Sequence, residues 1–218
     1  MRSRTLLTIL ILATLAVPAL AQRRAVVVHH PRPVGPSRFQ LVFEGGAALP
    51  AGDLADPYIG TEKGLGAETG YELGVRLRYR VTDNLAIGPS FHYADFGDWE
   101  AVAGDGTPYA IRASAYRYGL DLQQFLAGPD APLRPYLTIG GALIHNRYED
   151  WILGEGSYDT ASDNLAATAG AGLAFGPVEI SATWNYNVAT LRPLVEIGGD
   201  ADFDWSYFTV RAGLALGR

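Results

Sequence analysis

The stretch YELGVRLRYRV, residues 71–81, carries an arginine at every second position from Arg76 through Arg78 to Arg80. Leucine, tyrosine and valine stand between and after these arginines. Neighbouring side chains of a β-strand point to opposite faces, so one face of this stretch is charged and the other is apolar. The stretch therefore predicts a strand that separates a polar space from an apolar one.

Seven other segments show the same alternation, at residues 39–49, 85–94, 116–123, 136–148, 165–175, 178–188 and 207–216. Short links follow the second, fourth and sixth of the eight segments, at residues 82–84, 128–133 and 176–177. Long links follow the others, at residues 50–64, 97–110, 149–163 and 191–205. Eight strands joined by alternating short and long links are typical of an up-and-down barrel.

Such a barrel is either a secreted soluble lipocalin-like binder or a membrane barrel, and the two differ in the face that is apolar. Here the polar face consists mainly of Gly, Ala, Ser, Thr and Asn with scattered charges, which suits a crowded lumen better than a water-exposed surface. The other face is apolar over about ten residues per strand, the length that a tilted strand needs to cross a bilayer. An arginine turned toward lipid near the midplane would cost about 2 to 4 kcal/mol, so residues 76–80 direct their arginines into the lumen. We predict an all-β fold, a closed eight-stranded antiparallel up-and-down transmembrane β-barrel.

The N-terminal segment predicts export from the cytoplasm. Arg2 and Arg4 precede an apolar run from Leu6 to Val17, and the sequence Ala19-Leu20-Ala21 follows. A basic start, an apolar stretch too short to span a bilayer and an A-x-A site describe a secretory signal peptide over residues 1–21. Residues 22–37 are rich in proline and arginine and are interpreted as a periplasmic leader, and residues 38–218 as the barrel domain.

Composition narrows the range of partners. The chain has 218 residues, a formal net charge of −6 and no cysteine. An acidic chain offers no basic surface for a polyanion, so no nucleic-acid partner is expected. Without cysteine there is neither a disulfide framework nor a thiolate metal site.

The signal peptide, the eight amphipathic strands, the alternating links and the final strand YFTVRAGLALG together resemble the OmpA-like superfamily of small outer-membrane β-barrels. The resemblance covers about residues 38–218 and concerns architecture rather than a specific motif. It implies a Gram-negative-type outer membrane, contact with its lipid, and insertion by the barrel-assembly machinery. It also implies that the short turns lie in the periplasm and the long loops outside the cell.

Charged residues on the lumen faces predict an ion-pair network. An eight-stranded barrel is just wide enough for side chains, and an unpaired buried charge would cost about 3 to 5 kcal/mol. The residues of the predicted network are Glu44, Glu72, Arg76, Arg78, Arg80, Arg117, Asp121, Glu179 and Arg211. We predict a plugged lumen, and the alternative is a small transport barrel or narrow channel for a hydrophobic or small polar solute.

The long links are acidic. Their carboxylates are Asp53, Asp56, Glu62, Asp98, Glu100, Asp105, Glu149, Asp150, Glu155, Asp159, Asp163, Glu196, Asp200, Asp202 and Asp204. Only Lys63 and Arg192 offset them, which indicates a solvated surface with a structural or surface-interaction role, for which the extracellular partner is not defined. The segment GGDADFDW, residues 198–205, begins like an EF-hand loop, but Trp205 and Arg211 occupy positions that require Gly and Glu. No metal site and no cofactor are assigned.

No catalytic residues are assigned either. Ser90 and His92 lie two residues apart on one strand face, as a hydrolytic pair would. By the alternation they face the lumen, where acyl chains of the membrane do not reach them. The sequence therefore favours a protein that is not an enzyme.

Overall fold

A computed structural model describes residues 38–56, 64–102, 106, 108–152, 156–191 and 201–217, which fall within one compact unit, Pro36–Arg218. The predicted signal peptide, 1–21, and leader, 22–37, lie outside the described residues. So do five of the predicted loop carboxylates, Glu62, Asp105, Glu155, Glu196 and Asp200. No helix among the described residues is long and apolar enough to cross a membrane.

The described chain consists of strands and one short 3-10 helix, η1 (Gly52–Leu54). The strands are β1 (Phe39–Pro50), β2 (Gly70–Arg80), β3 (Leu85–Val102), β4 (Pro108–Phe125), β5 (Arg134–Ile152), β6 (Gly156–Phe175), β7 (Val178–Leu191), β8 (Ala201–Asp204) and β9 (Tyr207–Leu216). Each of the eight predicted segments lies largely within one of these strands. β8 is an addition, because it lies within the link predicted at residues 191–205.

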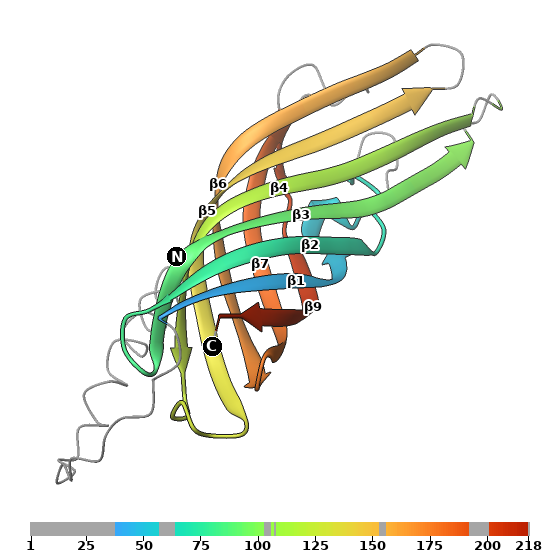
Figure 1. Cartoon of the computed structure of the whole chain (residues 1–218). Coiled ribbons are helices and arrows are strands. Elements are labelled where there is room, and N and C mark those ends of the chain that lie inside the picture. The colour runs from blue at the N-terminus through green and yellow to red at the C-terminus, as the bar shows by residue number, and fades with distance from the viewer. Residues whose placement is uncertain are drawn as a thin grey trace, which may run out of the picture. The chain divides into compact units, whose positions relative to one another are not determined.

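Eight of the described strands close a barrel (Figure 1). β1 to β7 pair in chain order, each antiparallel to the next. β9 then pairs with both β7 and β1, as in the registers Ile180↔Ala212 and Glu44↔Gly213, so no edge remains at the closure. Among the described strands, β8 pairs only with β7, along the last residues of that strand from Val188 to Leu191. The predicted closed, antiparallel, up-and-down barrel is confirmed.

The two ends of the barrel differ, and we name them by their connections. At the turn end, residues 81–84, 126–133 and 176–177 link neighbouring strands tightly. The last of these turns depends on Gly176, whose φ of 62° lies in the left-handed region that favours glycine. At the opposite, hairpin end, β3–β4 and β5–β6 run past the ends of β1 and β2 (Figure 1).

The predicted long links at residues 97–110 and 149–163 are therefore wrong in part. β3 continues to Val102 and β4 begins at Pro108, while β5 continues to Ile152 and β6 begins at Gly156. A β-bulge between Asp95 and Asp98, with Gly97 at a φ of 75°, redirects β3 where this extension starts. Beyond the apolar part of the barrel both faces of a hairpin meet polar surroundings, so the alternation that reveals a strand disappears from the sequence.

The barrel interior has three layers. A hairpin-end cluster of apolar side chains includes Leu54 and Leu65 from the first connection, Phe203 from β8, and Trp205, all 2% exposed or less. A small turn-end cluster consists of Ala86, Phe125, Tyr136 and Ala174, each beside a short turn. Between the two clusters the interior is polar and charged.

Candidate functional site: the ion-paired lumen

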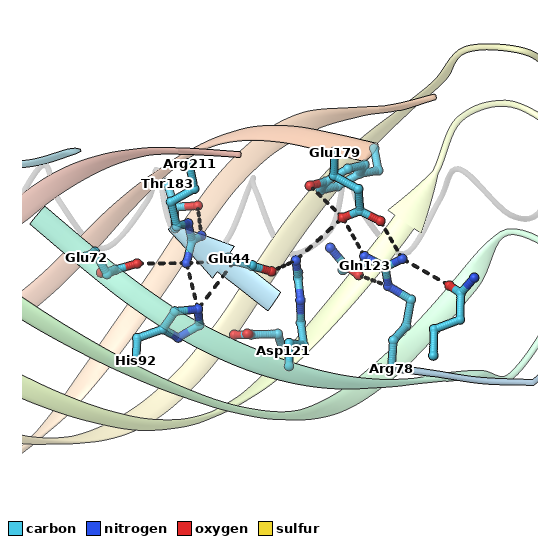
Figure 2. A network of polar contacts seen from close by, with 12 residues as sticks. Glu44, Glu72, Arg78, His92, Asp121, Gln123, Glu179, Thr183 and Arg211 are labelled. Atoms are coloured by element: carbon cyan, nitrogen blue, oxygen red, sulfur yellow. Dashed lines mark hydrogen bonds and ion pairs between the residues drawn. The ribbon is translucent and has the colours of Figure 1, made fainter. Parts of the chain in front are cut away.

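The alternation of each strand places the charged side chains of the lumen. On β2, Glu72, Arg76 and Arg78 are buried, whereas Tyr71, Leu73 and Leu77 on the opposite face are exposed. β1 contributes Glu44, β4 contributes Arg117 and Asp121, β7 contributes Glu179, and β9 contributes Arg211, all buried. These eight residues and His92 of β3 form what we call the lumen network, of which Figure 2 labels Glu44, Glu72, Arg78, His92, Asp121, Glu179 and Arg211.

Glu179 of β7 anchors the part of the network nearer the turn end. Arg78 donates two parallel hydrogen bonds to its carboxylate, from Nη1 to Oε1 at 2.6 Å and from Nη2 to Oε2 at 2.7 Å. Arg76 lies 3.7 Å from the same carboxylate and also donates to Oε1 of Glu44. The Nε atom of Arg78 donates to Oε1 of Gln123 at 2.6 Å. Because β2 and β7 are not neighbours in the barrel, the contacts of Arg78 and Arg76 with Glu179 span the lumen.

Arg211 of β9 organises the part nearer the hairpin end. Its Nη1 donates to Oε1 of Glu72 at 2.9 Å and lies 3.2 Å from Oε2 of Glu44. Its Nη2 donates to Oγ1 of Thr183 at 2.6 Å. Glu44 is therefore shared by Arg76 and Arg211, which joins the two parts into one network (Figure 2).

His92 lies between two arginines. Nη1 of Arg117 is 2.7 Å from Nδ1 of His92, and Nη1 of Arg211 is 2.9 Å from Nε2. Nε2 also lies 3.4 Å from Oε2 of Glu44, so its hydrogen is directed to that carboxylate when Nδ1 accepts from Arg117. Both ring nitrogens already have polar partners, so neither is free to act as a base for Ser90. This geometry therefore does not support Ser90 and His92 as a hydrolytic pair.

Charge balance explains how the network is tolerated. Four carboxylates, Glu44, Glu72, Asp121 and Glu179, face four guanidiniums, Arg76, Arg78, Arg117 and Arg211. Burying a single charge is costly, and only close pairing with hydrogen bonds repays the desolvation. Each of the four arginines lies within 3.2 Å of a carboxylate oxygen. The network is therefore neutral as a whole, although each member depends on the others.

Arg80 is the one residue of the predicted ion-pair network that lies outside the lumen network. It is half-buried at the turn end of β2, and no carboxylate of the described residues lies within 4.0 Å of its guanidinium. Its Nη2 donates a long hydrogen bond of 3.3 Å to Oε1 of Gln40.

The sequence-based prediction did not include His92, Gln40, Gln123 and Thr183 in the network, because these side chains carry no formal charge that demands a partner. All four occupy lumen-facing positions, so strand alternation alone identifies them.

Close packing within the lumen also requires glycine at one position. A Cβ atom on Gly74 of β2 would lie 2.0 Å from Cδ2 of His92, which is far inside van der Waals contact. Gly74 and His92 are register partners on β2 and β3. The absence of a side chain at residue 74 therefore leaves room for the imidazole between Arg117 and Arg211.

The outer face of the barrel is apolar, in contrast to the lumen. Its exposed large side chains include Leu41, Phe43, Leu73, Leu77, Phe91, Leu120, Leu137, Leu143, Leu173, Ile180, Trp184, Val210 and Leu214. A row of rings formed by Tyr71, Tyr93, Tyr116 and His145 crosses β2 to β5 toward the hairpin end. Phe39 and Tyr79 form another contact at the turn end, eight residues or roughly 26 Å along β2 from Tyr71. The charges are buried inside the barrel, and the outside carries an apolar band flanked by aromatic rings. Such an exterior suits contact with lipid and not with water.

The chain is a transmembrane β-barrel protein. The soluble lipocalin-like alternative is ruled out, because it would require the apolar face to point inward. The membrane-spanning segments are the parts of the strands that lie between the two groups of aromatic rings.

Comparison with solved structures finds small barrels of bacterial outer membranes. Neisserial surface protein A is 19% identical, with a TM-score of 0.48 over 84% of this chain and 99% of that chain. Ail, the attachment invasion locus protein of Yersinia pestis, is 14% identical, with a TM-score of 0.49 over 82% and 99%. OprG from Pseudomonas aeruginosa is 14% identical, with a TM-score of 0.47 over 84% and 99%. No protein-family model matches the sequence, and no curated protein matches it. The membrane location follows from the chain's own exterior rather than from these similarities.

The described residues offer little for metal chemistry. No three His, Cys, Asp or Glu side chains among them gather in a group that could hold a metal ion. The carboxylates of the lumen network are instead occupied by guanidiniums. The arrangement fixes the strands to one another across the lumen.

Proposed function

We propose that this protein is an outer-membrane barrel with a plugged lumen, which acts as a structural or surface-interaction protein through its acidic extracellular loops and hairpins. The proposal places the short turns in the periplasm and the hairpins outside the cell. It includes removal of the signal peptide, residues 1–21, and insertion by the barrel-assembly machinery. It assigns no catalytic activity.

The observation that carries the plugged lumen is the layered interior. The lumen network crosses the barrel from β2 to β7, through Arg78 and Glu179, and from β9 to β2, through Arg211 and Glu72. On either side of it the hairpin-end cluster and the turn-end cluster add apolar side chains to the lumen. An ion moving along the axis would have to separate buried pairs and cross two apolar layers, each of which opposes entry of a charge.

The observation that supports a surface role is the pair of long hairpins. They carry exposed carboxylates above the apolar band, including Asp98, Glu100, Asp159 and Asp163. Arg147 joins β5 to β6 through hydrogen bonds to Asp159, the shortest of 2.7 Å. These hydrogen bonds hold the pKa of Asp159 below its usual value. Paired strands with cross-strand ion pairs give a partner a defined acidic surface rather than a flexible loop.

Conductance in planar bilayers tests the plugged lumen. We expect the refolded mature chain to produce no reproducible openings, and Arg147→Gln, which alters only a hairpin, to behave identically. Steady openings whose size changes in Arg78→Gln or Arg117→Gln would favour the transport alternative instead. Faster migration of unboiled than of boiled protein in a semi-native gel checks that the barrel is folded in each preparation.

Binding of whole cells to a polylysine-coated surface tests the acidic hairpins. The variant Asp98→Asn/Glu100→Gln/Asp163→Asn removes three exposed charges and none of the lumen network. We expect it to reduce attachment at low salt, where screening is weakest. Equal attachment of wild type, the variant and cells without the protein would argue against a surface-interaction role. Protease added to whole cells should cleave the hairpins and spare the short turns, and the reverse pattern would overturn the proposed orientation.

A further inference from the structure

Two arginines at the turn end of the lumen remain outside the charge balance of the network. Arg80 ends β2 and Arg134 begins β5. Both occupy positions that face the lumen by strand alternation, since Arg78 and Tyr136, two residues away on the same strands, are buried inside the barrel. Among the described residues, no carboxylate lies within 4.0 Å of either guanidinium.

Arg134 is held in place by its surroundings. Its Nη2 donates to the backbone oxygen of Asp83 in the β2–β3 turn at 2.9 Å, and its Nε donates to the backbone oxygen of Ala127 at 3.4 Å. Its guanidinium carbon lies 4.1 Å from the centre of the Phe125 ring. An arginine stacked on an aromatic ring and fixed by two carbonyls is ordered before any ligand arrives.

The turn end of the lumen, with Arg80 and Arg134, forms what we call the turn-end mouth. The positive charges at this mouth repel one another. Arg80 and Arg78 both act unfavourably on the charge of Arg134, whereas Glu179 and Asp83 act favourably on it but more weakly. Glu179 is already held by two hydrogen bonds from Arg78. The mouth therefore presents two guanidiniums that have no anionic partner of their own.

Hydrogen-bond donors also remain unused there. The Nε atom of Arg80 is buried without a partner, and so is Nε2 of Gln123. Arg80 and Gln123 are both register partners of Ala86 on β3, so they flank the same point of the lumen wall. The oxygen that Arg80 contacts, Oε1 of Gln40, also accepts a hydrogen bond of 3.1 Å from Arg78 and satisfies Arg80 poorly. Buried donors and uncompensated positive charge both call for an anionic acceptor.

We infer that the turn-end mouth of the lumen is a binding site for a phosphate-type oxyanion, held between the guanidiniums of Arg80 and Arg134. A tetrahedral oxyanion accepts several hydrogen bonds at once, and the planar fork of arginine matches its geometry. In the proposed orientation this mouth opens to the periplasm. The phosphate belongs either to a soluble molecule or to a phospholipid headgroup of the inner leaflet, which share the same chemistry. The inference does not depend on the surface role proposed above.

Nuclear magnetic resonance of the refolded mature chain in an uncharged detergent tests the site. Inorganic phosphate is titrated against sodium chloride at matched ionic strength, and the Nε–Hε resonances of Arg80 and Arg134 are followed. We expect a saturable shift of both resonances with phosphate and not with chloride. Arg80→Gln and Arg134→Gln should each weaken phosphate binding by about tenfold or more, because each removes a charged donor.

The controls separate this site from general attraction of anions. Arg147→Gln removes a charge from a hairpin and should leave the phosphate titration unchanged. Arg80→Lys keeps the charge but loses the planar fork, and provides a second variant if Arg80→Gln fails to fold. Shifts that are linear and equal in phosphate and chloride would overturn the inference. So would a saturable shift of the Arg134 resonance that persists unchanged in Arg80→Gln, together with one of the Arg80 resonance that persists unchanged in Arg134→Gln.

A second arm distinguishes the two sources of phosphate. The same resonances are compared in nanodiscs of phosphatidylcholine alone and of phosphatidylcholine with phosphatidylglycerol, without free phosphate. Saturable shifts that require phosphatidylglycerol assign the site to a lipid headgroup, and shifts that require added phosphate assign it to a soluble molecule. No specific shift in either arm would remove the site.

Discussion

Two arginine–carboxylate pairs of this barrel have nearly the same shortest nitrogen–oxygen distance and opposite surroundings. In the lumen, Arg78 and Glu179 are 2.6 Å apart with side chains 3% and 4% exposed. On the β5–β6 hairpin, Arg147 and Asp159 are 2.7 Å apart with side chains 42% and 48% exposed. Water and ions screen the second pair and not the first. Distance alone therefore says little about what a pair contributes, and burial decides it.

The difference also changes what happens when one partner is lost. A surface arginine without its carboxylate returns to water at little cost. A lumen arginine without its carboxylate stays buried, because apolar clusters lie toward both ends of the lumen and lipid surrounds the barrel. In the lumen each charge is therefore needed mainly because its partner would otherwise be buried unpaired. Breaking one pair in the lumen and one pair on the hairpin tests this difference.

The largest effect is expected from Glu44→Gln. Glu44 is shared by Arg76, Arg211 and His92, so neutralising it leaves surplus positive charge in the lumen. We expect the free energy of unfolding to fall by about 3 to 5 kcal/mol, the cost of breaking a buried ion pair. Urea unfolding in phospholipid vesicles, followed by tryptophan fluorescence, measures it. A loss of less than about 1 kcal/mol would mean that water reaches the network and screens it as it does a surface pair.

A smaller effect is expected from Gly74→Ala. The added methyl group would collide with the His92 ring and push it from its place between Arg117 and Arg211. We expect a loss of about 1 to 3 kcal/mol, as for other overpacked interiors. The double variant Gly74→Ala/His92→Ser, which makes room for the methyl group, should be less sensitive to the alanine than wild type is. Equal cost of Gly74→Ala in both backgrounds would place the strain elsewhere.

The smallest change in stability is expected from Asp159→Asn on the hairpin. We expect a loss below about 1 kcal/mol that shrinks further as salt is added, because the pair is exposed. The same unfolding assay at low and high salt measures it. A loss comparable to that of Glu44→Gln would contradict the distinction between the two regions.

The acid titration of Asp159 gives a matching prediction without unfolding. Hydrogen bonds from Arg147 lower the pKa of this carboxyl, so the pair is fully present above the usual aspartate pKa and is lost as pH falls through the lowered value. Carbon-13 resonances of the Asp159 carboxyl should show a midpoint that rises toward the usual value in Arg147→Gln. An unchanged midpoint would mean that the hydrogen bonds do not persist in solution.

Much of the barrel could be predicted from period-two alternation. A lipid-facing strand has to be apolar on one side, so the residues of 71–81 reveal both the strand and its inward face. The extensions of β3 to β6 could not be predicted in this way, because outside the bilayer neither face is constrained to be apolar. The short strand β8 was missed for a similar reason, since four residues are too few to show a period.

The sequence by itself determined which side chains enter the lumen, since the alternation of each strand is a local property of the backbone. Only the tertiary structure decided which charges meet. Glu179 and Arg78 are 101 residues apart and face each other through the registers of closure, which no local pattern encodes. The same registers place His92 between two arginines and leave Arg80 and Arg134 without carboxylate partners among the described residues. Pairing in a barrel depends on how all eight strands close, and closure is a property of the whole ring.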